Sequence, residues 1–318
     1  MKYSKIIGVG SYLPETILTN AELEKIVDTT DEWIFQRVGI RERHVIGVSQ
    51  ETVSSMAVGA AHRALAASQL TAANIDMVVV CTTTSDYLFP SVACIVQQQL
   101  GIKNNCPAFD LNAACAGFIY GISVVDQFIK TNSIGNALII GVDALTKTVD
   151  WNDRSTCVLF GDGAGAIILQ QSSDPGVLST HIHADGSYVE ALYSKSPLWN
   201  SQPANIHMKG NTVFKIAVTQ LGNIVEQTLA KSGLKKTDVN WLIPHQANAR
   251  IIEAIAKRLD LSMDRVILTV AEHGNTSAAS VPLALDHALQ TGKIKRGDVL
   301  MLEAFGAGLA WGSALIKY

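Results

Sequence analysis

The sequence predicts an α/β fold made of two similar halves with mainly parallel strands. Strand-like and helix-like stretches alternate along the whole chain, which favours sheets covered by helices. The same order of elements occurs twice, and each occurrence ends in a glycine-rich segment. The length of 318 residues suits two domain-sized units, or one double-sized unit with a large core.

The first repeated unit is a helix that leads through a polar turn into a buried strand. In the first half, a helical pattern follows Thr52 and ends before a strand at 77–80. In the second half, a helical pattern follows Thr212 and ends before a strand at 240–243. The helix starts lie 160 residues apart and the strand starts 163 apart, which indicates a duplicated unit.

The second repeated unit joins a turn of small residues, a long amphipathic helix and another buried strand. It occupies residues 114–141 in the first half and 274–304 in the second. Each half then closes with a glycine-rich segment, FGDGAGAIIL or FGAGLAWGSALI, which we interpret as a hairpin. We place the boundary near Ser172–Pro175, which divides the chain into residues 1–172 and 173–318.

The composition excludes several classes of protein. Hydrophobic residues make up 48% of the chain and charged residues 17%, so the chain folds around a core and is not disordered. Twenty-five basic against 28 acidic residues give a net charge of −3, which provides no general basic surface for nucleic acid. No apolar run has the roughly 18 residues of a membrane span, and Met1–Pro14 lacks the apolar segment of a signal peptide. We therefore expect a soluble, cytoplasmic protein.

Two other patterns argue against metal and dinucleotide binding. The five cysteines are irregularly spaced without a CxxC pair, so neither a zinc site nor a disulfide framework is indicated. Gly8 and Gly10 follow a strand, but Leu13 stands where a dinucleotide-binding loop has its third glycine. FGDGAG runs into a strand, so no helix N-terminus follows it for a pyrophosphate. We interpret both sets of glycines as hairpin glycines.

Cys115 is the cysteine whose surroundings suggest chemistry. It stands among alanines and Gly117, at the start of a helical pattern that continues through Phe118 and Ile122. Unpaired N–H groups at a helix start favour a thiolate, so we predict a lowered pKa for this thiol. The structural alternative is a small residue that fills a tight core.

His245 and Asn275 are the corresponding candidates in the second half. His245 follows a strand and Pro244, and it precedes an amphipathic helix; its alternative role is a hydrogen-bonded structural histidine. Asn275 opens the second small-residue helix, as the counterpart of the Cys115 turn; its alternative role is an N-cap.

These three residues become more informative when they are considered together. Two copies of one fold commonly pack about a pseudo-twofold axis, and α/β sheets carry their sites at the carboxyl ends of parallel strands. We therefore expect Cys115, His245 and Asn275 to meet around one cavity. A cysteine supplies a nucleophile, a histidine a proton partner, and an asparagine a neutral donor that stabilises an enolate or oxyanion.

Several segments in this order resemble β-ketoacyl-acyl-carrier-protein synthase III, the condensing enzyme with the thiolase fold that begins bacterial type II fatty acid synthesis. The resemblance covers essentially the whole chain. The segments are DEWIFQRVGIRERH at 31–44, LNAACAGF, PHQANARI, HGNTSAAS, FGDGAG and FGAGLAWGSAL. It implies a duplicated thiolase-like fold in five layers, αβαβα, with mixed, mainly parallel sheets.

The resemblance also implies roles for the candidate residues. Cys115 corresponds to the residue acylated by an acyl-CoA primer, with acetyl-CoA as the family's usual choice. His245 and Asn275 correspond to the pair that binds the thioester of malonyl-acyl carrier protein while CO₂ leaves. The backbone N–H groups of Cys115 and Ala307 match the family's oxyanion hole. Relatives often have glycine at position 307, and alanine restricts φ there.

Further positions match the family's binding surfaces. Trp33, Arg37 and Arg154 match residues that hold the adenine and phosphates of coenzyme A, which suits an indole and two guanidinium groups. Two asparagines, Asn211 and Asn248, match groups along the pantetheine arm. The resemblance implies no cofactor and no metal, because the coenzyme A thioester is a substrate.

The remaining matched positions concern protein partners. Phe89 matches the residue that reaches into the acyl pocket of a partner subunit, so a homodimer is implied. Arg250 and Lys257, seven residues apart on one helix face, and Lys215 are candidates for docking the acidic carrier protein. An ordinary solvated helix face is the alternative.

Three other functions compete with this interpretation. A papain-like protease also orders Cys, His and Asn, but its signature around the cysteine is absent and the duplicated pattern does not suit that fold. A subunit that binds acyl chains without condensing them would not need all three candidate catalytic residues. A condensing enzyme or acyltransferase of secondary metabolism on the same scaffold stays open.

Overall fold

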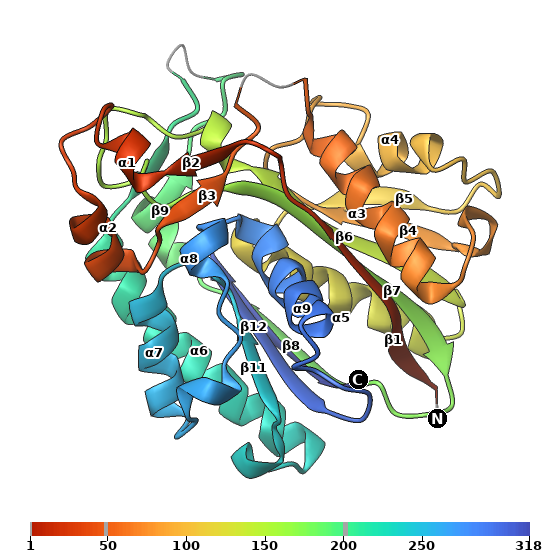
Figure 1. Cartoon of the computed structure of the whole chain (residues 1–318). Helices are drawn as coiled ribbons and strands as arrows, with labels where there is room; N and C mark the ends of the chain where they lie inside the picture. Colours follow the sequence, from red (N-terminus) through yellow and green to blue (C-terminus); the bar gives the residue numbers. More distant parts are fainter. Residues whose placement is uncertain (1, 48–49, 200–202) are drawn as a thin grey trace.

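The computed structural model describes residues 2–47, 50–199 and 203–318, and five layers alternate in it between helices and sheets (Figure 1). Two helices form the central layer, a sheet lies on each side of them, and further helices cover each sheet from outside. This is the five-layer arrangement that the sequence predicts. Among the described residues, no helix combines the length and hydropathy needed to cross a bilayer.

The first sheet has five strands in the order β1-β7-β6-β4-β5. The strands β6, β4 and β5 are parallel, whereas β7 is antiparallel to both of its neighbours. The bounds are β1 Tyr3–Tyr12, β4 Met77–Cys81, β5 Ala108–Leu111, β6 Asn136–Ala144 and β7 Asp162–Ser172.

The second sheet has four strands in the order β11-β12-β13-β8. The bounds are β8 Val177–Ala184, β11 Trp241–Pro244, β12 Val299–Gly306 and β13 Ala310–Lys317. β11 and β12 are parallel, and β13 is antiparallel to both of its neighbours. Antiparallel pairing is thus more extensive than predicted, because β7 and β13 each return beside the strand that precedes them.

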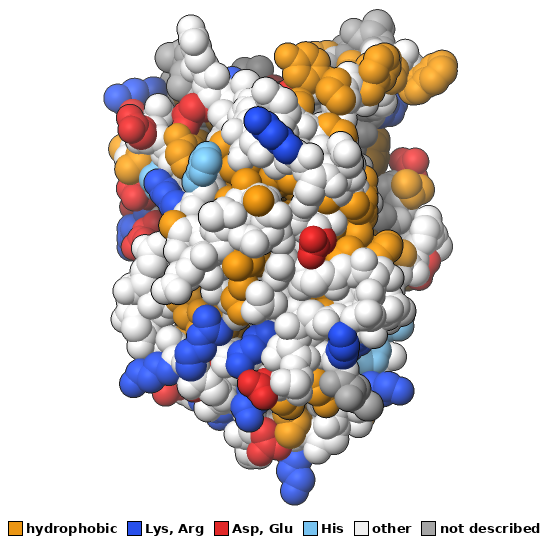
Figure 2. Space-filling model, turned by 90° about the vertical axis from the view of Figure 1, so that its right-hand side faces the viewer, with side chains coloured by type: hydrophobic (Ala, Val, Ile, Leu, Met, Phe, Trp, Pro, Cys, Tyr) orange, Lys and Arg blue, Asp and Glu red, His pale blue; other side chains and the backbone are white. Residues whose placement is uncertain are grey.

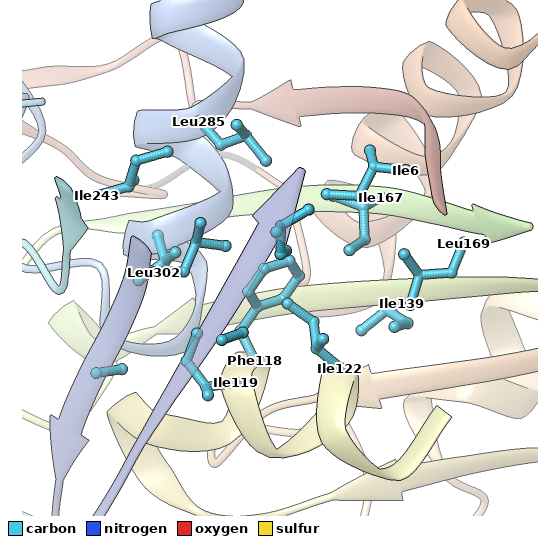
Figure 3. Packing of buried hydrophobic residues seen from close by; sticks show 14 of the residues in the cluster. Ile6, Phe118, Ile119, Ile122, Ile139, Ile167, Leu169, Ile243, Leu285 and Leu302 are labelled. Atoms are coloured by element: carbon cyan, nitrogen blue, oxygen red, sulfur yellow. The ribbon is translucent and has the colours of Figure 1, made fainter. Parts of the chain in front are cut away.

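The central layer consists of α5, Gly117–Lys130, and α9, Ser280–Gln290. Because both helices lie between two sheets, they are apolar on most of their surface. Figure 3 shows Phe118 and Ile122 of α5 beside Ile139 of the first sheet, with Leu302 of the second sheet in the same cluster.

The outer layers are two pairs of helices. α3, Val53–Ser68, and α4, Val92–Gln99, cover the first sheet, and α6, Gly210–Ser232, and α7, Ala249–Arg258, cover the second (Figure 1). The smaller elements are α1 Asn20–Leu23, α2 Asp31–Val38, α8 Val270–His273, β2 Ile17–Thr19, β3 Glu42–His44, β9 Leu192–Ser194 and β10 Ile206–Met208.

The predicted glycine hairpins exist only at the end of the chain, between β12 and β13. Gly8 lies inside β1, where an added Cβ would overlap the carbonyl oxygen of Ala64 in α3. Gly165 lies inside β7, where an added Cβ would come within 2.7 Å of Pro282 in α9. The hairpin interpretation is therefore wrong for these glycines, which let helices pack closely on strands.

A 163-residue offset relates the turns that precede the two central helices. The 3₁₀ turns Ala114–Ala116 and Ser277–Ala279 lead directly into α5 and α9. Their first residues both adopt left-handed backbone, with φ of 47° at Ala114 and 52° at Ser277. This offset places Ala278 opposite Cys115, and it pairs Asn275 with Asn112. The predicted equivalence of the two turns is therefore confirmed. Within them, however, the counterpart of Asn275 is Asn112, and the counterpart of Cys115 is Ala278.

A buried acid in β12 predicts a pH-dependent stability. The side chain of Glu303 is fully buried, and no described residue donates a hydrogen bond to either carboxylate oxygen. Burial raises its pKa to about 8 from an ordinary value of 4.5. The unfolded chain releases this proton as the pH rises through the ordinary value, whereas the folded chain keeps it until about pH 8. The stability that Glu303 contributes is therefore fully present below its ordinary pKa of 4.5, and it is lost as the pH rises toward 8.

We expect the free energy of unfolding to fall by about 3 kcal/mol between about pH 5 and pH 8 because of this group. Glu303→Gln keeps a similar shape without the titration, so the variant lacks this fall. Denaturant unfolding of both proteins at the two pH values measures the difference. An identical pH dependence in the two proteins would contradict the assignment to Glu303.

Candidate active site

Residues 275–280 form the segment around which the three predicted catalytic residues gather. Asn275 opens this segment, and its Oδ1 atom accepts the N–H of Ser277 at 2.9 Å. The 3₁₀ turn Ala114–Ala116, which carries Cys115, packs against the turn Ser277–Ala279 of this segment. At the end of the segment, Ser280 Oγ lies 2.6 Å from Nδ1 of His245. The structure therefore gathers Cys115, His245 and Asn275 around this segment, and each is less than a tenth exposed.

Cys115 stands in the 3₁₀ turn before α5, at the interface between the two halves of the fold. Its environment overturns the predicted lowering of its pKa. Burial raises the pKa of the thiol to about 12, because the sulfur has lost the water that would stabilise its charged form. The resting nucleophile is therefore a thiol, and it must lose its proton as it reacts.

A glycine leaves the N–H of Cys115 free. The 163-residue offset pairs Asp143, at the end of β6, with Gly306, at the end of β12. Asp143 Oδ2 accepts the N–H of Ala278, the counterpart of Cys115, at 3.3 Å. Gly306 has no side chain to do the same, and within the described part of the chain no oxygen atom accepts the N–H of Cys115. A Cβ atom at position 306 would lie 2.6 Å from the Cys115 nitrogen.

The turn after Gly306 accommodates Ala307 without strain. Ala307 does not adopt left-handed backbone, whereas Gly308 does, with φ of 137°. The residue that requires glycine is therefore Gly308, and an alanine at 307 keeps its N–H without strain.

His245 follows directly on β11 and is held at both ends. Its backbone N–H donates to the carbonyl of Glu303 in β12 at 2.8 Å, and its ring contacts Ser280 in α9. Burial lowers the pKa of His245 to about 4, because the charged ring would lack solvation. The imidazole is therefore neutral near pH 7 and carries a single N–H group.

Asn275 is held by its backbone, which leaves its side-chain NH₂ group available. Its N–H donates to Leu159 O at 2.8 Å, and its carbonyl accepts the N–H of Gly161 at 3.0 Å. Because Oδ1 already accepts from Ser277, the group left to act is Nδ2, and no described residue accepts a hydrogen bond from it. The site thus offers two neutral donors, one from His245 and one from Asn275.

The three residues predicted to hold the coenzyme A nucleotide also lie together. The guanidinium carbons of Arg37 and Arg154 each lie 4.8 Å from the centroid of the Trp33 ring. Arg154 Nη1 donates to the carbonyl of Asp28 at 2.7 Å. Asn248 caps α7, and its Nδ2 donates to Arg37 O at 3.4 Å, so it adjoins this cluster.

Four further predicted residues lie outside these clusters. Asn211 lies exposed in the first turn of α6. Lys215 is exposed on α6, and Arg250 and Lys257 are exposed on α7, which packs beside it.

Phe89 belongs to the segment between β4 and α4, and it is 83% exposed. Figure 2 faces the side of α4 and β5 and shows hydrophobic side chains gathered toward its upper edge. Tyr87 and Leu88 are exposed beside Phe89 in the sequence.

Sequence reasoning missed three residues that shape the site: Ser277, Ser280 and Asp143. It also missed Gln246, whose side chain donates to Pro244 O and Ile267 O and accepts from Thr269 N, which fixes the loop after His245. The regular 163-residue offset is the signal that could have found Asp143, because it pairs this carboxylate with Gly306 at the equivalent strand end.

The five-layer duplicated fold and its buried cysteine, neutral histidine and asparagine amide define a thiolase-fold condensing enzyme. Comparison with known proteins narrows this class. The family model described as 3-oxoacyl-[acyl-carrier-protein] synthase III matches residues 109–186, and the model of its C-terminal part matches residues 229–318.

Individual members of this family match the sequence over its full length. The chain is 59% identical over 318 residues to a β-ketoacyl-[acyl-carrier-protein] synthase III of Coxiella burnetii, with all of both chains covered. It is 56% identical over 320 residues to that of Thiobacillus denitrificans, again with full coverage of both. The crystal structure of the Aquifex aeolicus 3-oxoacyl-[acyl-carrier-protein] synthase III has a TM-score of 0.95 at 46% identity, covering 99% of this chain and 100% of the other. The chain belongs to the β-ketoacyl-acyl-carrier-protein synthase III family, and it is an acyltransferase.

Proposed function

We propose that this protein condenses an acyl-CoA primer, with acetyl-CoA as the expected one, with malonyl-acyl carrier protein, and so begins type II fatty acid synthesis. The observation that carries the proposal is the meeting of Cys115, His245 and Asn275 around residues 275–280. In this view the reaction has two steps, because a single cysteine first receives the acyl group and then gives it up.

In the first step, the Cys115 sulfur attacks the thioester carbonyl of acyl-CoA. A bond forms between this sulfur and the acyl carbon, the bond from that carbon to the coenzyme A sulfur breaks, and the thiol proton passes to the departing thiolate. The N–H groups of Cys115 and Ala307 stabilise the oxyanion of the tetrahedral intermediate. Support comes from the free N–H of Cys115 beside Gly306.

In the second step, His245 and Asn275 donate hydrogen bonds to the thioester oxygen of malonyl-acyl carrier protein. Loss of CO₂ moves negative charge onto that oxygen, and neutral donors stabilise the charge as it develops. The enolate carbon then attacks the acyl carbon on Cys115, and the cysteine sulfur leaves and regains a proton. The product is a β-ketoacyl chain two carbons longer.

The substrates approach from the side of α2 and α7 in this proposal. Trp33, Arg37 and Arg154 bind the nucleotide of coenzyme A, because an indole face and guanidinium groups suit a purine and its phosphates. Asn248, next to Arg37, and Asn211 follow the pantetheine arm. The exposed residues Phe89, Tyr87 and Leu88 and the open edge of β5 support a homodimer in which Phe89 enters the partner's acyl pocket.

We propose that Arg250, Lys257 and Lys215 dock the acidic carrier protein. We expect Arg250→Glu to lower turnover with malonyl-acyl carrier protein about tenfold, because the variant replaces attraction by repulsion at a rim charge. The rate of Cys115 acylation by acyl-CoA should stay unchanged. Steady-state rates and single-turnover acylation measure the two effects, and an equal loss of both would contradict the docking role.

A direct test of the function uses a panel of acyl-CoA thioesters. Intact and peptide mass spectrometry should find the acyl mass on the Cys115 peptide. Addition of malonyl-acyl carrier protein should then release CO₂ and a β-ketoacyl carrier. Absence of any acyl mass on this peptide, or condensation without it, would refute the proposal.

A further inference from the structure

We propose that Ser280 is a positioning residue that holds His245 in the tautomer with its proton on Nε2. The inference rests on the proposed function of His245 as a hydrogen-bond donor. It adds that Ser280 sets the tautomer in which the Nε2 atom of His245 can donate. Ser280 itself does not contact the reacting atoms in this proposal. It acts through the ring nitrogen on the far side of the imidazole.

The hydrogen bonds of the Ser280 hydroxyl determine the tautomer. Its Oγ lies 2.6 Å from His245 Nδ1, and both side chains are buried. In the part of the chain that the structure describes, the hydroxyl has no other hydrogen-bond partner. A buried hydroxyl proton requires an acceptor, so Oγ–H donates to Nδ1. Because the buried imidazole is neutral and has one N–H, that proton is on Nε2.

The two elements that carry this pair are rigid. Ser280 is the first residue of α9, in the central layer between the two sheets. The backbone N–H of His245 is fixed to Glu303 O at the end of β11. The ring is therefore held at its backbone and at Nδ1. Its other nitrogen has no hydrogen-bond partner among the described residues and stays free for a substrate oxygen.

The first half of the fold shows that the helix itself does not need this serine. When the register of β11 is continued by one residue beyond Pro244, His245 becomes the counterpart of Cys81 at the end of β4. The 163-residue offset makes Ser280 the counterpart of Gly117. A Cβ atom at Gly117 would lie 3.2 Å from the Cβ of Cys81, so these two residues also adjoin. A glycine suffices at the start of α5, where no imidazole has to be held. The hydroxyl occurs in the half that carries the histidine.

The test combines a tautomer measurement with two separate activities. In protein labelled with ¹⁵N-histidine, the His245 resonances are identified by their loss in His245→Gln. The wild type should show a protonated Nε2 and an unprotonated Nδ1 near pH 7. Ser280→Ala should shift these signals toward a mixture of tautomers and lower the decarboxylation of malonyl-acyl carrier protein about tenfold. Acylation of Cys115 should be unchanged, and Ser280→Thr should restore both the spectrum and the rate.

A control variant removes the hydroxyl group that contacts the ring of another histidine, His181. Thr228 Oγ1 in α6 lies 3.0 Å from His181 Nδ1 in β8 and also bonds to Ser313 Oγ in β13. Thr228→Val should leave decarboxylation and the His245 signals unchanged. A wild-type spectrum with the proton on Nδ1, or a Ser280→Ala protein with unaltered His245 signals, would overturn the inference. A different result would contradict the proposed function itself. If His245→Gln released CO₂ at the wild-type rate, His245 would not be a donor in decarboxylation, whichever tautomer the wild type shows.

Discussion

Cys115→Ala is expected to abolish acyl transfer, with a loss of roughly 10⁴-fold or more in condensation, because the variant lacks the sulfur atom that receives the acyl group. The variant should still release CO₂ from malonyl-acyl carrier protein, since His245 and Asn275 keep their positions. Cys115 is buried in a turn of small residues, so an alanine fits there without a clash. Mass spectrometry of the peptide and a CO₂ assay measure the two activities.

The control for this variant is Cys157→Ala, which removes a buried thiol in a different hydrophobic cluster. It should acylate and condense as the wild type does. Condensation that survives Cys115→Ala would rule out the acyl-cysteine intermediate, and with it the two-step reaction.

Gly306→Ala is expected to lower the rate of Cys115 acylation by roughly 10²–10³-fold, the effect of losing one oxyanion donor. The added Cβ would lie 2.6 Å from the Cys115 nitrogen and 3.1 Å from that of Ala116, so it would occupy the space that the oxyanion needs. The backbone of the turn would have to shift to relieve this overlap. Single-turnover acylation with an acyl-CoA measures the rate, and thermal unfolding shows whether the variant is folded.

Ala307→Gly is the matched control one residue further along the same turn. It keeps the N–H group and relaxes φ at a position that does not need left-handed backbone. Its acylation rate should stay within about threefold of the wild type, since the donor is kept. If Gly306→Ala acylated as fast as this control, the free N–H of Cys115 would not be the oxyanion donor.

The sequence indicated three candidate catalytic residues because each lies in a loop at the end of a predicted strand. Cys115, His245 and Asn275 occupy loops at strand ends in two copies of one pattern, and the pattern indicated that such loops meet. Ser280 could not be recognised in this way. A serine at a helix start has many ordinary uses, and only its contact with His245 distinguishes it.

The glycine segments and the cysteine pKa show where local reasoning failed. Gly8 and Gly165 were interpreted as hairpin glycines because turns are the commonest use of such patterns, yet helices pack against them. The helix start beside Cys115 predicted a lowered pKa. Burial between two sheets has the opposite and larger effect, and the sequence around the cysteine does not report how much water is excluded.

By itself, the sequence determined the α/β alternation and the duplication and offered three candidate chemical groups, since these follow from periodicity and residue type along the chain. Only the tertiary structure decided which groups touch, which nitrogen of His245 no described residue contacts by a hydrogen bond, and which N–H of the Cys115 turn no described oxygen accepts. The physical reason is that these properties depend on contacts between residues that are far apart in the chain. The packing of two sheets around α5 and α9 creates those contacts, and it also removes the water that would otherwise set each pKa.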